Sequence, residues 1–221
     1  HAYFERDAGR AQAIYSSMLQ EFPFDVEARW LLALSYDLAF EDDAAVAELK
    51  RLLEQEPQND YFWSYLGESY LRLGEYDLAR QALDQYLKFK PRDPFGFTTL
   101  GQLDQLTGNL SRAADHFAHA LELEPGFVPA RLALARTQVL RNMWDDAEAQ
   151  LRRLASDEEA SAGIRIDAAF DLSALLRGQG RFADSIQPLE MLEPLIRKEE
   201  VREAMALAER GVGVHVMGHP V

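Results

Sequence analysis

The 221-residue sequence contains no cysteine, which excludes disulfide bonds, thiol catalysis and thiolate metal sites and leaves the compartment open between cytoplasm and periplasm. It has no apolar run of transmembrane length, so we expect no direct membrane insertion. Basic residues are in the minority, with 23 Lys and Arg against 37 Asp and Glu and a formal net charge of −14. Nucleic acid is an unfavourable partner for such a chain, because phosphates bind basic surfaces. A neutral or basic protein partner is easier to accommodate.

The sequence also lacks the residue combinations that catalysis needs, such as a nucleophile with its base, a paired acid and base, or a metal site. His116 and His119 are three residues apart, and His215 and His219 are four apart, but no H-E-x-x-H motif accompanies them. We therefore predict that the chain is not an enzyme and holds no metal or cofactor. Acidic pairs at expected helix starts are predicted to cap those helices and to favour their dipoles; they are Asp42 with Asp43 and Asp145 with Asp146.

Proline is scarce but regularly placed. Four of the nine prolines follow one another at intervals of 34 residues: Pro23, Pro57, Pro91 and Pro125. A fixed period of this size indicates stacked copies of one supersecondary unit.

Residues 60–93 show what one copy contains. Its first half carries apolar and small residues at helical spacing, Gly74 marks a turn, and its second half carries another helical stripe before Pro91 ends the unit. Each helix is apolar on one face only, so neighbouring copies must stack to bury these faces. The residues that define the two stripes are Trp63, Leu66, Gly67 and Tyr70, then Ala79, Leu83 and Tyr86.

This pattern resembles the tetratricopeptide repeat (TPR) family along essentially the whole chain. The resemblance implies an all-α fold, a right-handed superhelical solenoid of stacked helix-turn-helix repeats. We predict a single TPR-like solenoid over 1–221. Its divisions are a partial repeat at 1–25, repeats at 26–59, 60–93, 94–127 and 128–165, a divergent repeat at 166–203 and a partial repeat at 204–221.

The ends and the divergent repeat depart from the pattern. We expect His1 to Arg6 to be the tail of a truncated first helix, and the chain to be a fragment of a longer protein. The segment Ala155–Ile166 adds about one helical turn before the divergent repeat. In that repeat Pro188 falls inside the expected second helix, where it is predicted to bend or end the helix, and Arg197 stands where a proline is expected.

In proteins that resemble this chain, ligands often lie in the concave groove that the first helices line. The predicted groove carries one large apolar side chain per repeat, and such exposed stripes usually mark an interaction site. The same side chains would alternatively pack between neighbouring first helices. The apolar side chains of this stripe are Trp30, Tyr61, Phe95, Leu132 and Phe170, and Leu34 is a further predicted contact. The polar contacts that set register are Glu68, Gln102, Arg136 and Arg177.

These observations favour a non-catalytic protein–protein interaction scaffold that binds a peptide, helix or protein partner in its concave groove. The Lys and Asn residues with which some TPR proteins clamp a chaperone C-terminus are missing, so a chaperone-tail adaptor is not expected. One alternative is a regulatory or assembly arm of a larger multidomain enzyme or envelope-export protein. Another is self-association through exposed end helices, since neither end carries a convincing polar cap.

Overall fold

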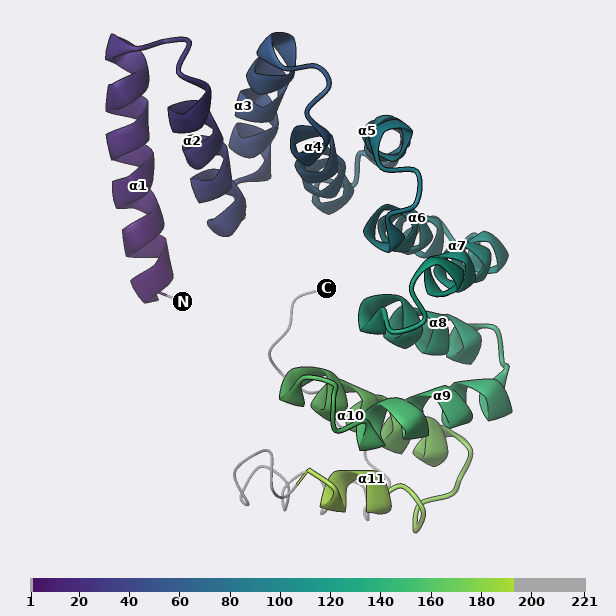
Figure 1. The fold of residues 1–221 in the computed structure, drawn as a ribbon. Helices are drawn as coiled ribbons and strands as arrows, with labels where there is room; N and C mark the ends of the chain where they lie inside the picture. Colours follow the sequence, from purple (N-terminus) through teal and green to yellow (C-terminus); the bar gives the residue numbers. More distant parts are fainter. Residues whose placement is uncertain (1, 193–221) are drawn as a thin grey trace. The chain divides into compact units, whose positions relative to one another are not determined.

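The computed structural model describes residues 2–192, with side chains from Ala8 onward, and all regular structure within this part of the chain is α-helical (Figure 1). The all-α, helix-turn-helix repeat fold is confirmed. No helix in the described part combines the length and apolarity needed to cross a membrane. The chain divides into two compact units, His1–Asn109 and Leu110–Val221.

Unit 1 is a stack of antiparallel helices in chain order. Each helix packs on its sequence neighbour, and α4 also contacts α6. The helices are α1 (Ala2–Glu21), α2 (Val26–Leu38), α3 (Asp42–Gln55), α4 (Asp60–Arg72), α5 (Tyr76–Phe89) and α6 (Pro94–Leu106).

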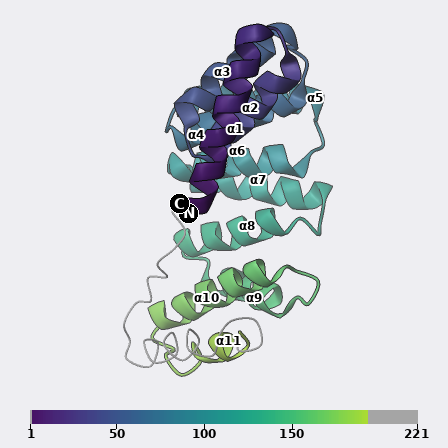
Figure 2. The ribbon, with the colours of Figure 1, turned by 90° about the vertical axis from the view of Figure 1, so that its left-hand side faces the viewer.

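Unit 2 continues the same alternation of helices and short turns. Within it α8 contacts α7, α9 and α10, and α10 also packs on α9 and α11 (Figure 2). The helices are α7 (Leu110–Leu123), α8 (Val128–Leu140), α9 (Trp144–Ser156), α10 (Ala162–Gly178) and α11 (Gln187–Glu190).

The core repeats with the period of the sequence. One alanine of each second helix has no exposed surface, and the residue four positions later is at most 1% exposed. Small residues are needed here because paired helices approach closely: a Cβ atom on Gly67 would lie 2.9 Å from the Leu83 side chain. The alanines are Ala45, Ala79, Ala113 and Ala147, followed by Leu49, Leu83, Phe117 and Leu151.

The helix starts repeat as well. The side chains of Asp25, Asn59 and Asp93, spaced by 34 residues, each accept a hydrogen bond from a backbone N–H in the first turn of α2, α4 or α6. After three of the four closing prolines, the side chain six positions later ties the turn to the helix, since it donates a hydrogen bond to that proline's carbonyl oxygen. This tie joins Arg29 to Pro23, Trp63 to Pro57 and Arg131 to Pro125.

The turns within the repeats need one residue with positive φ. Glycine supplies it in three turns and Asn142 in another, but Phe40 occupies this position after α2 with φ 57°. A left-handed conformation costs a residue other than glycine roughly 1–2 kcal/mol, and asparagine tolerates it better than a bulky side chain does. Phe40 therefore adopts a strained conformation. The three glycines are Gly74, Gly108 and Gly180.

Two sequence predictions about helix starts are wrong. The acidic pairs do not cap α3 and α9, whose N-cap residues are Glu41 and Met143 and make no side-chain cap hydrogen bond. The acids lie one to three positions after these N-cap residues, in the first turn, where the helix dipole still favours negative charge. Residues 2–6 are also no separate helix, because α1 runs without a break from Ala2 to Glu21.

The divergent repeat begins with a longer first helix. The extra turn predicted before it is present, because α10 starts at Ala162 and has 17 residues, where α8 has 13. Pro188 lies at the start of the four-residue α11, a position where proline removes no intrahelical hydrogen bond. The predictions for Arg197, for His215 and His219 and for residues 204–221 lie outside the described residues.

Asp93 offers a test of the turn chemistry, because it both caps α6 and accepts a hydrogen bond from the Tyr86 hydroxyl. Burial and this bond raise the pKa of Tyr86 above its ordinary value. We expect Asp93→Ala to lower the free energy of unfolding by about 2–3 kcal/mol, since the cap and a hydroxyl partner are both lost. Asp25→Ala, which removes only a cap, should cost about 1 kcal/mol. Urea unfolding followed by circular dichroism measures both; equal losses would contradict the added role of Tyr86.

Candidate functional site

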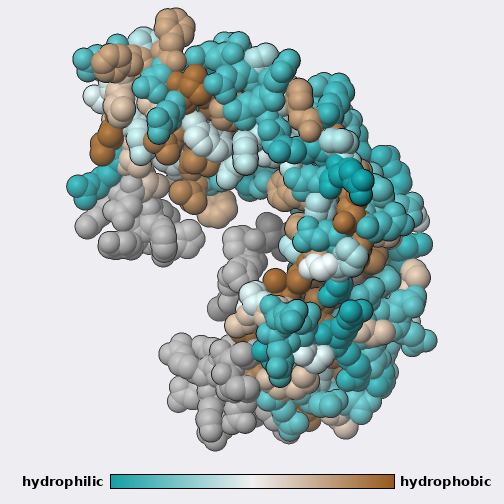
Figure 3. Space-filling model, in the orientation of Figure 1, coloured by the Kyte–Doolittle hydropathy of each residue, from teal (hydrophilic) through white to brown (hydrophobic). Residues whose placement is uncertain are grey.

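In each unit by itself, the candidate site is the face formed by the first helices of the repeats, and we call it the first-helix face of that unit. These helices are α2, α4 and α6 in unit 1 and α8 and α10 in unit 2. Hydrophobic side chains reach the surface of unit 1 among hydrophilic ones (Figure 3). Of the predicted contacts, Tyr61 is 64% exposed, and Gln102 and Arg136 are also exposed. The others except Leu132 are half-buried: Trp30, Leu34, Glu68, Phe95, Phe170 and Arg177.

Leu132 is not part of an exposed stripe. It is 8% exposed and belongs to the hydrophobic core of unit 2, together with Ala135, Leu151 and Leu172. The expectation that it presents apolar surface is wrong, because its side chain packs in this core, which is formed by side chains of α8, α9 and α10.

Aromatic side chains on α4 hold Trp30 in place. Its ring lies 5.2 Å from that of Phe62 and 4.9 Å from that of Tyr65, the latter edge-on. This geometry is favourable for aromatic pairs. Trp30 therefore joins α2 to α4 and shows only part of its surface to a partner.

Tyr61 and Phe95 occupy equivalent positions in successive repeats but differ in their surroundings. Phe95 packs edge-on against Tyr86, with 6.1 Å between ring centroids. Tyr61 stands at the start of α4 beside an open hollow lined by residues 56–60 of the preceding turn. Tyr61 is consequently the predicted aromatic contact with the most free surface.

Arg72 organises the charges of the first-helix face in unit 1. Its guanidinium contacts the carboxylates of Asp37, of Asp42 at 2.7 Å and of Glu68 at 3.9 Å, and so joins α2, α3 and α4. Burial raises the pKa of Glu68, although the Arg72 cation acts in the opposite direction. Burial and the nearby carboxylates also raise the pKa of the Tyr65 hydroxyl.

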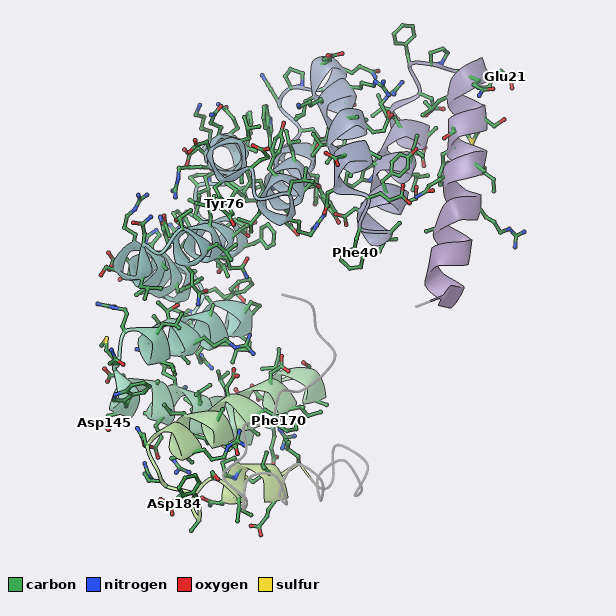
Figure 4. The ribbon with its side chains drawn as sticks, turned by 180° about the vertical axis from the view of Figure 1, so that it is seen from behind. Glu21, Phe40, Tyr76, Asp145, Phe170 and Asp184 are labelled. Atoms are coloured by element: carbon green, nitrogen blue, oxygen red, sulfur yellow. The ribbon has the colours of Figure 1, made fainter. Side chains whose placement is uncertain are left out.

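A corresponding ion pair connects the first helices of unit 2. Arg136 on α8 lies 2.6 Å from Asp171 and 4.0 Å from Asp167, both on α10. Burial raises the pKa of Asp171 against the effect of Arg136. Phe170 on the same helix packs against the core (Figure 4). Arg177, whose pKa burial lowers, donates to the carbonyl oxygen of Ser173 at 3.4 Å.

Sequence reasoning missed the partners that fix these side chains. Phe62 and Tyr65 follow Trp30 by about one repeat length, but the spacing alone does not predict that their rings contact the Trp30 ring. A usable signal existed for the charges: Asp37 and Arg72 are 35 residues apart, and so are Arg136 and Asp171. In both cases, oppositely charged residues 35 positions apart, one residue more than the repeat length, form an ion pair between neighbouring first helices.

The chemistry of this face suits contact with a protein surface. It combines exposed aromatic area with charges that are already paired and held in position. No group of three or more side chains suited to holding a metal ion occurs in the described part of the chain. His119, a candidate from the sequence, lies 3.1 Å from Glu122 on the same helix.

Comparisons with known families and proteins agree with this architecture. One tetratricopeptide repeat model matches residues 43–94, and a second matches residues 5–64 and again 106–165. The chain is 27% identical over 112 residues to Superkiller complex protein 3 of Mus musculus, covering 50% of this chain. It is 28% identical over 125 residues to the general transcriptional corepressor ssn6 of Schizosaccharomyces pombe, covering 55% of this chain. The match spans only 7% and 11% of the length of these two relatives.

Solved structures share the fold at low sequence identity. A tetratricopeptide repeat protein from Parabacteroides merdae superposes with a TM-score of 0.71 at 17% identity, over 91% of this chain and 78% of that one. The Cut9–Hcn1 hetero-tetramer structure of the APC/C gives a TM-score of 0.69 at 18% identity, over 92% and 40%. A thermophilic TPR protein of Thermus thermophilus gives 0.63 at 22% identity, over 83% and 98%.

The raised pKa of Glu68 predicts a pH-dependent stability. Between its ordinary pKa, about 4.3, and its higher value in the fold, the folded state binds more protons than the unfolded state, so this residue lowers stability as pH rises. We therefore expect Glu68→Gln to become more stable relative to the wild type as pH rises from about 4 to 7, so that its free energy of unfolding minus that of the wild type increases.

Chemical denaturation at several pH values measures this difference. Gln102→Glu places a carboxyl at the equivalent but exposed position on α6, and its difference from the wild type should stay nearly constant with pH. If the difference in free energy of unfolding between Glu68→Gln and the wild type is also constant with pH, burial does not raise the pKa of Glu68.

Proposed function

Since the chain belongs to the tetratricopeptide repeat family, whose repeats are generally protein-interaction scaffolds, we propose that it is a non-catalytic scaffold that binds a peptide, helix or protein partner along its first-helix face. This is the face predicted from the sequence to line a concave groove. The observation that carries the proposal is Tyr61, an aromatic side chain that is 64% exposed at the start of a first helix.

The surroundings of Tyr61 favour a binding role over a packing role. Aromatic side chains dominate the energetics of protein interfaces because they bury much area with few rotatable bonds. At the other end of α4, Arg72 is already paired with Asp37 of α2, so a partner that lies along this helix does not have to neutralise an isolated charge there. Phe95, one repeat further on, extends the aromatic surface at the equivalent position.

The remaining predicted contacts take subsidiary roles in this proposal. Trp30 and Leu34 supply partial apolar surface on α2, and Glu68 and Gln102 supply polar contacts on α4 and α6. In unit 2 the proposed contacts are the exposed Arg136 and the half-buried Phe170 and Arg177. Leu132 is left out because it is buried in the core.

The similar proteins support a protein as the partner. One relative is named as a member of the Superkiller complex, and one similar structure is a hetero-tetramer of the APC/C. These names describe assemblies of proteins, which is the class of ligand that the first-helix face suits. The alternative of an arm within a larger enzyme or export protein would use the same face, so both possibilities predict the same surface contacts.

Self-association is a second candidate, favoured by the outer face of α1. Ile14 and Met18, one turn apart, are 58% and 41% exposed. Arg10 and Glu21 flank them at either end of the same exposed side. An antiparallel contact between two copies of α1 would place Arg10 of one copy near Glu21 of the other, which is a self-complementary arrangement.

We expect Tyr61→Ala to abolish or strongly weaken capture of a partner from a lysate of the source organism, with no loss of helical circular dichroism. The side chain is largely exposed, so its removal should change stability by less than about 0.5 kcal/mol. Combining it with Phe95→Ala should weaken capture further, and the lost ring contact with Tyr86 should lower stability by about 1 kcal/mol in addition to the lost burial of the half-buried Phe95 side chain. Leu78→Ala, on the second helix α5, is the matched control. Equal capture by Tyr61→Ala and the wild type would refute the first-helix face as the site.

If α1 mediates self-association, sedimentation equilibrium should show a mass that rises with concentration for the wild type. Ile14→Lys with Met18→Lys should give a constant monomer mass, because burying two ammonium groups at the contact is unfavourable. Phe182→Lys, a comparably exposed site in unit 2, should leave the wild-type behaviour unchanged. A monomeric wild type at all concentrations would exclude this candidate.

A further inference from the structure

One turn of the repeat array contradicts the residue preference of all the others. The turn positions with positive φ are held by Gly74, Gly108, Asn142 and Gly180, and by Phe40 after α2. Glycine and asparagine enter this backbone conformation readily, whereas a bulky aromatic residue is an outlier there. Strain of this kind persists where the surrounding structure enforces it, and it is concentrated at functional sites.

The Phe40 side chain gains little from the fold in return. It is 66% exposed, and Leu38, two residues before it, is 74% exposed. Figure 4 shows the Phe40 ring at the end of α2, directed away from the helices. A strained backbone therefore displays two large apolar side chains to solvent, which is the opposite of what stability alone would favour.

The segment around these two residues is strongly acidic. Asp37, Glu41, Asp42 and Asp43 fall within one turn of chain on either side of Phe40. Arg72 pairs with Asp37 and Asp42. Asp43 is exposed, and Glu41, also exposed, accepts a hydrogen bond from the neutral Gln12 amide at 3.2 Å. The apolar pair is thus bordered by carboxylates, and within the described part of the chain Glu41 and Asp43 form no ion pair with a Lys or Arg side chain.

We propose that residues 37–43, here called the Phe40 turn, form a docking site for a cationic amphipathic helix of a partner protein. Apolar side chains of that helix pack on Leu38 and Phe40, and flanking Lys or Arg side chains pair with Glu41 and Asp43. The charge complementarity selects this occupant. A second copy of the chain in a two-fold contact would bring the same carboxylates against one another, and anionic lipid or nucleic acid would be repelled.

This site is separate from the Tyr61 surface of the proposed function and does not depend on it. Leu106 shows what is special about the Phe40 turn. It occupies the position of Leu38 two repeats further on and is 50% exposed. Its neighbours Gln105 and Thr107 are uncharged, and Gly108 relaxes the turn. Exposed leucine at this position therefore recurs, but among the five positive-φ turn positions of the described residues only the one after α2 is held by an aromatic side chain.

Phe40→Gly gives a test in which binding and stability change in opposite directions. Replacing phenylalanine with glycine relieves the backbone strain, so the urea midpoint of unfolding should rise. The probe is a fluorescently labelled synthetic helical peptide with a leucine face and flanking lysines. We expect fluorescence anisotropy to show binding to the wild type and an affinity at least tenfold weaker for Phe40→Gly. If Phe40 had only a structural role, its replacement would not weaken peptide binding while making the protein more stable.

Matched variants assign the binding to this turn. Leu38→Ser should weaken binding of the lysine peptide, Leu106→Ser should not, and Glu41→Gln with Asp43→Asn should weaken it and reduce its salt dependence. A peptide with glutamates in place of the lysines should not bind. The proposal is overturned if the wild type does not bind the lysine peptide, if Phe40→Gly binds it equally well, or if the glutamate peptide binds alike. Loss of binding in Tyr61→Ala alone would assign the peptide to the first-helix face instead.

Discussion

The close approach of paired helices is the constraint on which the rest of the structure depends. One alanine in each second helix has no exposed surface, and Gly67 on α4 leaves no room for a Cβ atom beside Leu83. Because the contact recurs every 34 residues, each repeat places its first helix in the same way. The caps at Asp25 and Asp93 and the ties to the closing prolines then fix where each helix begins.

The features predicted correctly from the sequence are those that this contact determines. The period of the prolines and the small residues at Gly67 and Ala79 were enough to predict the helix pairs and the buried faces. The errors concern the start of α1 and a residue whose surroundings differ from those of its counterpart in another repeat. Residues 2–6 have no preceding turn in the structure and simply continue α1. Leu132 looked like a surface residue because it occupies the position of Trp30 in its repeat, but it packs in a core formed by side chains of α8, α9 and α10.

The same distinction explains why the site was harder to predict than the fold. A period states which residues share a position but not what surrounds them. Tyr61 and Phe95 share a position, yet only Phe95 has Tyr86 beside it, and so only Tyr61 remains largely free. The ion pair between Arg72 and Asp37 joins residues of different repeats, which a description of one repeat cannot contain.

A regular scaffold also makes departures from it informative. Where every turn has the same backbone, the residue at its left-handed position should be chosen for that backbone, as Gly74 and Asn142 are. Phe40 departs from this choice at a position where it makes the fold less stable and leaves its ring exposed. A single substitution of Phe40 by glycine would relieve the backbone strain, since glycine holds the equivalent position in other turns. Phe40 lowers the stability of the isolated chain, so its presence is explained if its ring contacts another molecule. This is the physical reason for assigning the turn to recognition.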